Sequence, residues 1–330
     1  MNRKFVLARS PEGQLRTDHF RLVEDKVPEP ARGEVLIRTR HVSVDAANRA
    51  WMQGATYREA LSDGMVMAAG GIGEVVKSNA DGFAPGDFAY GETGWQEYAA
   101  LPVTGLTRLE PIEEMTNHLS IFGIPGLTAY FGLTQCGQPV QGETVLVSAA
   151  AGAVGLFVGQ VAKALGCKVV GIAGGPQKCA MLTERFGFDA AIDYKVEEPL
   201  RKAIRAAVPG GVDIYFDNVG GDILEAALSN MAQNGRIVCC GALAAYDGVP
   251  PAHGPRGIPG LLVTRRLTMR GFIVFDFYER RAEAIERLST WVKDGSIKVT
   301  EDRIDGFERL PEALVGLFEG GNVGKRIVSF

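Results

Sequence analysis

A run of small residues from Ala149 to Gly155 could hold the phosphates of a dinucleotide. It is Ala-Ala-Ala-Gly-Ala-Val-Gly, and from Ala150 onward it follows the pattern G-x-G-x-x-G with alanine in the first place. Gly152 would let the backbone approach a pyrophosphate, and Gly155 would let a helix pack closely on a strand. The amino-terminus of that helix would add N–H donors and a positive dipole. The alternative is an ordinary tight turn between a strand and a helix.

The choice of dinucleotide depends on the residues about twenty positions further along. An NAD enzyme places Asp or Glu at the end of its second strand, where the carboxylate accepts hydrogen bonds from the ribose. Here that strand is followed by Gly174-Gly175-Pro176-Gln177-Lys178, which contains no acid. Lys178 could instead make a charge-assisted contact with a 2′-phosphate. The sequence therefore favours NADP over NAD, and the alternative is that Lys178 is a solvated residue in a first helical turn.

The small residues lie within 19 uncharged residues between Glu143 and Lys163, a length that could suggest a membrane span. The internal pattern argues against a span. Residues 144–147 form a short β-branched run, and only from Val154 onward do apolar residues recur at helical spacing. A strand, a tight turn and a buried helix explain the whole stretch.

Strand-like and helix-like segments alternate after this point, which predicts a doubly wound parallel sheet of the Rossmann type. We expect further strands at 168–172, 190–193, 212–216 and 236–240, and helices at 178–186, 200–207, 223–231 and up to Gly295. A proline-rich loop is expected over 241–260, and a strand, a helix and a strand after Gly295. The first 120 residues hold short strands among Pro, Gly and Asp turns, such as 34–39 and 67–76, which is typical of an antiparallel β domain.

Composition excludes several classes of function. The chain has 330 residues, which favours two domains, and a net charge of −4, which gives no electrostatic footprint for nucleic acid or an anionic membrane. Five cysteines, an odd number without C-x-x-C spacing, fit a reduced cytoplasmic protein. The four scattered histidines and these cysteines do not form a convincing zinc ligand set, so we expect no metal. The chemistry that remains for this chain is hydride transfer from a nicotinamide cofactor without the help of a metal ion.

Several motifs together resemble the zinc-independent branch of the medium-chain dehydrogenase/reductase superfamily, which contains prostaglandin reductase, leukotriene hydroxydehydrogenase, 2-alkenal reductase and curcumin reductase. The resemblance runs from about residue 28 to the end. The segments that carry it are 123–130 (GIPGLTAY), 149–155, 193–195 (DYK), 216–221 (FDNVGG), 240–242 (CGA) and 321–325 (GNVGK).

The resemblance implies a GroES-like catalytic domain at 1–122, an NADP-binding Rossmann domain at 123–296, and a C-terminal return at 297–330 that completes the first domain. It implies NADPH as cofactor, a small unsaturated carbonyl compound as substrate, and a homodimer. Carried over residue by residue, it assigns the following positions to the cofactor: Thr128, Gly152, Ala153, Val154, Gly155, Gly174, Lys178, Tyr194, Asn218, Cys240, Tyr246, Phe272 and Asn322.

One stretch departs from the family. The usual Asp-Pro-Tyr-Met-Arg of the substrate pocket is replaced by Asp45-Ala46-Ala47-Asn48-Arg49. The pocket is therefore expected to be lined by Ala47, Arg49 and Tyr246, to be wider, and to lack one hydroxyl. For this reason the substrates of particular family members do not transfer.

Members of the branch reduce the carbon–carbon double bond of α,β-unsaturated aldehydes and ketones, with hydride delivered to the β-carbon and a proton to the α-carbon. Tyr246 is the predicted donor to the carbonyl oxygen, where negative charge develops. The cofactor's ribose hydroxyl, water, or a pocket-lining role for Tyr246 are the alternatives. Two other functions stay open at this point: an NADPH quinone oxidoreductase of the same superfamily, and a weakly catalytic, crystallin-like NADPH-binding protein.

Overall fold

The computed structural model describes residues 1–197, 199–248 and 254–330. These residues cluster into two compact units. Unit 1 comprises residues 1–119, 246–248 and 301–330, and unit 2 comprises residues 120–197, 199–245 and 254–300. The short segment 246–248 therefore groups with unit 1, whereas the sequence had placed it inside the nucleotide-binding domain.

Unit 2 contains a six-stranded sheet in the order β10-β9-β8-β11-β12-β13, in which all neighbours are parallel. The doubly wound parallel sheet predicted from the sequence is confirmed. Its strands are β8 (Thr144–Val147), β9 (Lys168–Ala173), β10 (Ala190–Asp193), β11 (Val212–Asp217), β12 (Met231–Cys239) and β13 (Thr268–Gly271). Its helices are α2 (Ile124–Phe131), α3 (Ala153–Ala164), α4 (Pro176–Glu184), α5 (Leu200–Ala207), α6 (Gly221–Leu228), α7 (Ile258–Arg265) and α8 (Arg281–Lys293), with a π-helical turn at Gly132–Gly137.

Helices cover both faces of this sheet, because alternate residues of each strand point to opposite sides. Val145 and Val147 of β8 pack in one core with residues of α2, α3 and α8. Leu146, between them, packs in a second core with residues of α5 and α6. Burial on both faces explains why residues 145–147 of β8 form a continuous apolar run in the sequence.

The uncharged stretch after Glu143 is divided as expected into a strand, a turn and a helix. Helix α3 has 12 residues. Within the described ranges no helix is both long and apolar enough to cross a membrane.

Two expectations about this region were wrong. Met231 begins β12 instead of ending the preceding helix, because α6 stops at Leu228 and the buried Met231 pairs with Val212. The expected irregular loop 241–260 is also shorter, since Ile258 begins α7. Residues 249–253 of that loop lie outside the described residues.

The sheet reverses its direction of progression between β8 and β11. From β8 the order runs to β9 and β10 on one side, and from β11 to β12 and β13 on the other. Open parallel sheets bind their ligands beyond the carboxyl ends of the strands at such a switch point. The predicted glycine turn follows β8 directly and Asn218 follows β11, so both lie at this position.

Unit 1 is built on a β-rich scaffold, as expected. A seven-stranded sheet has the order β14-β15-β3-β4-β5-β7, with β6 also paired to β3, and β1 and β2 form a separate antiparallel pair. The bounds are β1 (Asn2–Leu7), β2 (Phe20–Asp25), β3 (Glu34–Val44), β4 (Gly71–Ser78), β5 (Phe88–Gly91), β6 (Tyr98–Pro102), β7 (Thr107–Leu109), β14 (Glu301–Asp305) and β15 (Lys325–Ser329), with helices α1 (Ala47–Ala50) and α9 (Leu310–Phe318).

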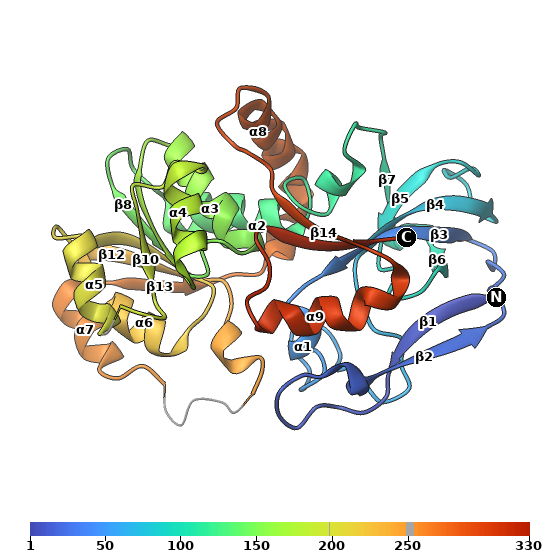
Figure 1. Ribbon diagram of the computed structural model, residues 1–330. Coiled ribbons are helices and arrows are strands. Elements are labelled where there is room, and N and C mark those ends of the chain that lie inside the picture. The colour runs from blue at the N-terminus through green and yellow to red at the C-terminus, as the bar shows by residue number, and fades with distance from the viewer. Residues whose placement is uncertain (198, 249–253) are drawn as a thin grey trace. The chain divides into compact units, whose positions relative to one another are not determined.

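The carboxyl-terminal strand is part of the sheet that the amino-terminal part of the chain forms in this unit. Strand β15 pairs antiparallel with β3, so red and blue strands lie side by side in Figure 1. A core around Trp95, Phe307 and Leu310 joins residues from both ends of the chain. The stretch Asp45–Arg49 directly follows β3 and is therefore held next to the carboxyl-terminal strand.

Candidate cofactor and active-site residues

The turn between β8 and α3 has a geometry that requires glycine. A Cβ atom on Gly155 would lie 2.4 Å from the carbonyl oxygen of Ala149 and 2.9 Å from the Cα of Ala150. Ala149 itself has a φ of 47°, in the left-handed region. At Gly152, the N-cap of α3, a Cβ would meet only the Ala149 oxygen, at 3.2 Å. The helix start is thus packed against the strand end and presents bare backbone at Gly152, which fits a pyrophosphate at a helix amino-terminus.

A buried carboxylate fixes the other side of the switch point. Asp217, at the end of β11, is 2% exposed. Its Oδ1 accepts hydrogen bonds from the hydroxyl of Tyr215 at 2.8 Å, from the amide of Gly220 at 2.9 Å and from Ser148 Oγ at 3.2 Å. Asn218 Nδ2 donates to the carbonyl of Ser148 at 2.8 Å, so the predicted cofactor residue is tied to the end of β8.

Asp217 and Ser148 were not among the predicted site residues. The available signal was an acid directly after the apolar run 214–216. Such an acid must find several donors to be tolerated there, and here it organises the loop ends around it.

The turn between β9 and α4 gathers the groups expected to recognise the 2′-phosphate. A Cβ on Gly174 would lie 3.0 Å from Tyr194 Cε1 and 3.0 Å from Lys195 Cε, so both side chains converge on this glycine. Lys178 is the third residue of α4 and is half-buried. Lys178 and Tyr194 were among the predicted site residues, whereas Lys195, which adjoins Tyr194 in the chain, was not.

A carboxylate from the next strand shapes this turn. Gly175 has a φ of 98°, and its amide donates to Asp193 Oδ1 at 2.9 Å. The same oxygen accepts from the amide of Lys195 at 3.0 Å. The end of β9 carries no acid, as the sequence indicated, but Asp193 of β10 reaches the turn and is occupied by backbone donors.

Three further predicted cofactor residues lie in unit 2. Thr128 lies in α2 and is buried. The ring of Phe272 covers Gly132, where a Cβ would lie 2.4 Å from Phe272 Cζ. Cys240 follows β12, and burial raises the pKa of its thiol to about 12, so this group is a neutral contact surface rather than a nucleophile at neutral pH.

In unit 1, a buried lysine holds the start of the stretch Asp45–Arg49, which was expected to line the substrate pocket. Lys325 is 0% exposed, and its Nζ donates to the Val44 carbonyl at 2.7 Å and to Asp45 Oδ1 at 2.5 Å. Burial lowers the pKa of this lysine, and Asp45 opposes that effect. Asn322, predicted to contact the cofactor, is 7% exposed and donates through Nδ2 to the Gly324 carbonyl at 2.9 Å.

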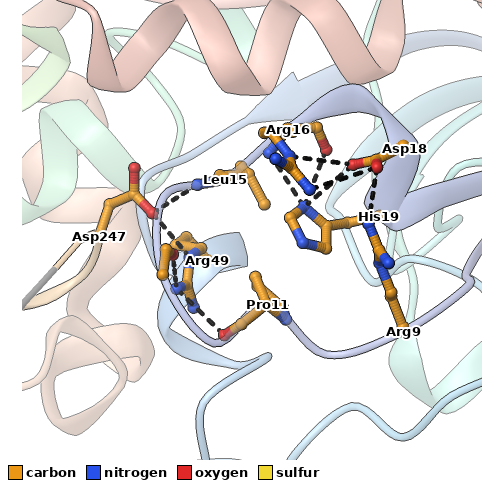
Figure 2. Close-up of polar contacts among 9 residues, drawn as sticks. Arg9, Pro11, Leu15, Arg16, Asp18, His19, Arg49 and Asp247 are labelled. Atoms are coloured by element: carbon orange, nitrogen blue, oxygen red, sulfur yellow. Dashed lines mark hydrogen bonds and ion pairs between the residues drawn. The ribbon is translucent and has the colours of Figure 1, made fainter.

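Helix α1 carries the other predicted pocket residues. Ala47 is half-buried, whereas Arg49 is 1% exposed. Figure 2 shows the Arg49 guanidinium directed at Asp247 and at the loop that contains Pro11. Its Nε donates to Asp247 Oδ1 at 3.0 Å and its Nη2 to the Gly13 carbonyl at 2.9 Å. The guanidinium is therefore occupied by the protein itself.

A second phenol lies near Tyr246. The ring of Tyr57 packs edge-on against Trp51, with 6.3 Å between centroids. Burial raises the pKa of Tyr57, and the charges of Asp45 and Tyr246 raise it further, which places its hydroxyl within electrostatic range of both. Tyr57 was not among the predicted site residues, because nothing in the local sequence pattern links it to Tyr246.

Two family models match the chain. Residues 3–109 match the N-terminal domain of oxidoreductase, and residues 153–290 match the zinc-binding dehydrogenase model. In the described part of the chain, no three His, Cys, Asp or Glu side chains are grouped so that they could hold a metal ion.

Full-length relatives specify the branch. The chain is 38% identical to the NADPH-dependent curcumin reductase of Escherichia coli, covering 99% of this chain and 96% of that protein. It is 40% identical to the NADP(+)-dependent 2-alkenal reductase of Nicotiana tabacum, covering 92% and 89%. The structure of CurA from Vibrio vulnificus in complex with NADPH matches with a TM-score of 0.94 and 36% identity over 99% and 98% of the two chains. The chain belongs to the zinc-independent branch of the medium-chain dehydrogenase/reductase superfamily.

Proposed function

We propose that the protein reduces the carbon–carbon double bond of α,β-unsaturated aldehydes or ketones with NADPH. The observation that carries the proposal is the Gly152–Gly155 turn at the switch point, in a chain similar over its whole length to an NADPH-dependent curcumin reductase. The geometry of both turns in unit 2 fits this cofactor.

In this proposal the cofactor is bound at three places in unit 2. The backbone at Gly152, Ala153, Val154 and Gly155 accommodates the pyrophosphate. The 2′-phosphate is bound by Lys178 and Tyr194 at the turn that contains Gly174, between β9 and α4. Lys195 adds a second cation there. The rest of the cofactor is contacted by four residues of unit 2, Asn218, Thr128, Cys240 and Phe272. The family resemblance also assigns Asn322 and Tyr246 of unit 1 to the cofactor. When bound, NADPH supplies the hydride for the β-carbon.

Tyr246 is proposed as the hydrogen-bond donor for the substrate's carbonyl oxygen. Negative charge develops on that oxygen as hydride arrives, and a fixed donor stabilises it more in the transition state than in the ground state. A phenol hydroxyl can donate this hydrogen bond. A proton must then reach the α-carbon, and Tyr246 or water can deliver it.

Ala47 and the nearby phenols are proposed to set substrate size. Ala47 presents a methyl group where relatives of the branch usually have tyrosine, and Arg49 behind it is buried. Tyr57, which packs edge-on against Trp51 and interacts electrostatically with Asp45 and Tyr246, is proposed as a further polar group of this pocket. A pocket with this composition accepts bulkier enones than one lined by tyrosine at position 47.

The protein is further proposed to act as a homodimer in the cytoplasm. The support is the resemblance to a branch whose members are commonly dimeric, together with five cysteines that are all unpaired thiols. Light scattering on purified protein tests the dimer, and a mass near that of one chain would contradict it.

The test of the activity is a substrate panel of short enals, aryl enones and quinones, with NADPH loss followed by absorbance and products identified by mass. Saturated aldehydes or ketones formed in step with NADPH loss are expected. Turnover of quinones to hydroquinones without reduction of enones would instead indicate a quinone reductase. Tight NADPH binding without oxidation on any member of the panel would indicate a crystallin-like binding protein.

A further inference from the structure

The buried ion pair between Arg49 and Asp247 joins three segments of unit 1 that are far apart in the sequence. Asp247 Oδ1 accepts from Arg49 Nε at 3.0 Å and from the amide of Leu15 at 2.8 Å. Arg49 Nη2 donates to the carbonyl of Gly13 at 2.9 Å and approaches that of Pro11 at 3.4 Å. Helix α1, the 11–15 loop and the 246–248 segment therefore share one polar cluster, which Figure 2 displays.

The Asp247 carboxylate is the anchor that ties the 246–248 segment to this cluster. This segment groups with unit 1, although residues 245 and 254, on either side of it, belong to unit 2. Helix α1 has only four residues, so it cannot form a rigid support by itself. Asp247 adjoins Tyr246, so the contacts that hold the Asp247 carboxylate also restrain the backbone that carries the phenol.

Stability alone is a poor explanation for this pair. The side chains are 1% and 15% exposed, and desolvation of two charges offsets much of their attraction. In addition, Arg49 Nη1 is buried and has no hydrogen-bond partner among the described residues. Apolar side chains of similar volume would fill this place at comparable stability. Apolar side chains would not fix the relative orientation of the two segments, whereas a planar guanidinium hydrogen-bonded to a carboxylate oxygen does.

We propose that the Arg49–Asp247 pair positions Tyr246 for catalysis, with the 11–15 loop as its outer support. The inference rests on the proposed function, in which Tyr246 donates to the substrate's carbonyl oxygen. Arg49 and Asp247 are positioning residues in this scheme, and neither touches the reacting atoms. It gives Arg49 a different role from the pocket-lining one expected from the sequence.

A double-mutant cycle on kcat for enone reduction tests the link to Tyr246. Asp247→Ala removes the acceptor, and we expect kcat to fall about 10- to 100-fold, the effect of moving a catalytic group by about 1 Å. Asp247→Asn keeps an acceptor oxygen and should recover most of the loss. In a Tyr246→Phe background, Asp247→Ala should lower kcat less than about threefold, because the group it positions is already gone. Equal losses in both backgrounds would overturn the proposal.

Hydrogen exchange of the backbone provides a readout that needs no activity. Asp247→Ala should raise exchange at Leu15 and at residues 246–248 together. The matched control is Asp302→Ala, since Asp302 accepts from Arg326 at 2.7 Å and Arg326 is also buried, with a contact to the Ala313 carbonyl at 2.8 Å. The control should lower stability without affecting exchange at residues 246–248.

These measurements separate the failure of the inference from the failure of the proposed function. If the wild-type enzyme reduces no enone, the proposed function fails, and exchange alone decides whether the pair fastens the segment. If Asp247→Ala leaves exchange at residues 246–248 unchanged, the positioning role is refuted whatever the activity.

Discussion

Replacing Gly155 with alanine tests whether the turn after β8 is built for close approach of backbone to backbone. The new Cβ would lie 2.4 Å from the Ala149 oxygen, about an ångström short of the 3.4 Å at which ordinary contact begins. The obstructing atoms belong to the backbone, so no side-chain rotation relieves the clash. Overpacking of this kind costs roughly 1–3 kcal/mol. The higher helix propensity of alanine returns up to about 1 kcal/mol.

We therefore expect Gly155→Ala to lower the free energy of unfolding by about 1 to 2 kcal/mol, as measured by urea denaturation. The matched control is Gly260→Ala in α7, where a Cβ would meet nothing within 4 Å. This control should be neutral or stabilising by up to about 1 kcal/mol. A Gly155→Ala protein as stable as this control would refute the argument that the turn requires glycine.

Gly152→Ala separates the fold from the cofactor. Its Cβ would lie 3.2 Å from the Ala149 oxygen, a distance that a shift of a few tenths of an ångström relieves. Stability should change by less than about 1 kcal/mol, as for an alanine at an N-cap. NADPH binding, measured by cofactor fluorescence, should weaken about tenfold, or about 1.4 kcal/mol, because a methyl group stands where the pyrophosphate approaches. Unchanged affinity would place the pyrophosphate elsewhere.

Three further outcomes are expected. Lys178→Ala should weaken NADPH binding by ~1.5 to 3 kcal/mol and leave NADH binding nearly unchanged, and Lys195→Ala should act in the same direction; equal losses for both cofactors would contradict a 2′-phosphate contact. Tyr246→Phe should lower kcat for enones about 100-fold or more, and unchanged turnover would end its proposed role as donor. Burial raises the pKa of Cys239 to about 11 and that of Cys240 to about 12. The thiolate fraction at pH 7.5 is therefore very small, and alkylation of the native protein at these two positions should be slow and should accelerate about tenfold per pH unit up to those values.

Local pattern predicted much of unit 2. Strands at 144–147 and 190–193 occur where the sequence indicated, because runs buried on both faces carry a continuous apolar signal. The signal failed at Met231, since an apolar residue after a helix can continue its stripe or begin the next strand. Met231 belongs to β12 because it pairs with Val212 on the neighbouring strand. Val212 is too far away in the sequence for a short stretch around Met231 to reveal this contact.

The residues that shape the candidate site were harder to predict for a related reason. Asp193 and Asp217 are acids at strand ends, and the sequence gives no sign that their oxygens accept backbone amides from Gly175 and Gly220. A carboxylate at such a place could equally repel a phosphate or bind a ribose. The role of the carboxylate depends on its hydrogen-bond partners. A carboxylate oxygen that already accepts hydrogen bonds from two backbone amides is partly neutralised, and it stabilises the turn.

The polar cluster around Arg49 extends this reasoning to unit 1. Arg49 was expected to face substrate because it occupies a position in the family's pocket motif, but its donors are directed to residues 36 and 198 positions away. Arg49 is bound to the segment that carries Tyr246 through Asp247. In the proposed scheme the two functions can therefore vary independently: Ala47 would alter which substrates fit, and the Arg49–Asp247 pair would keep the proposed donor in place for any of them.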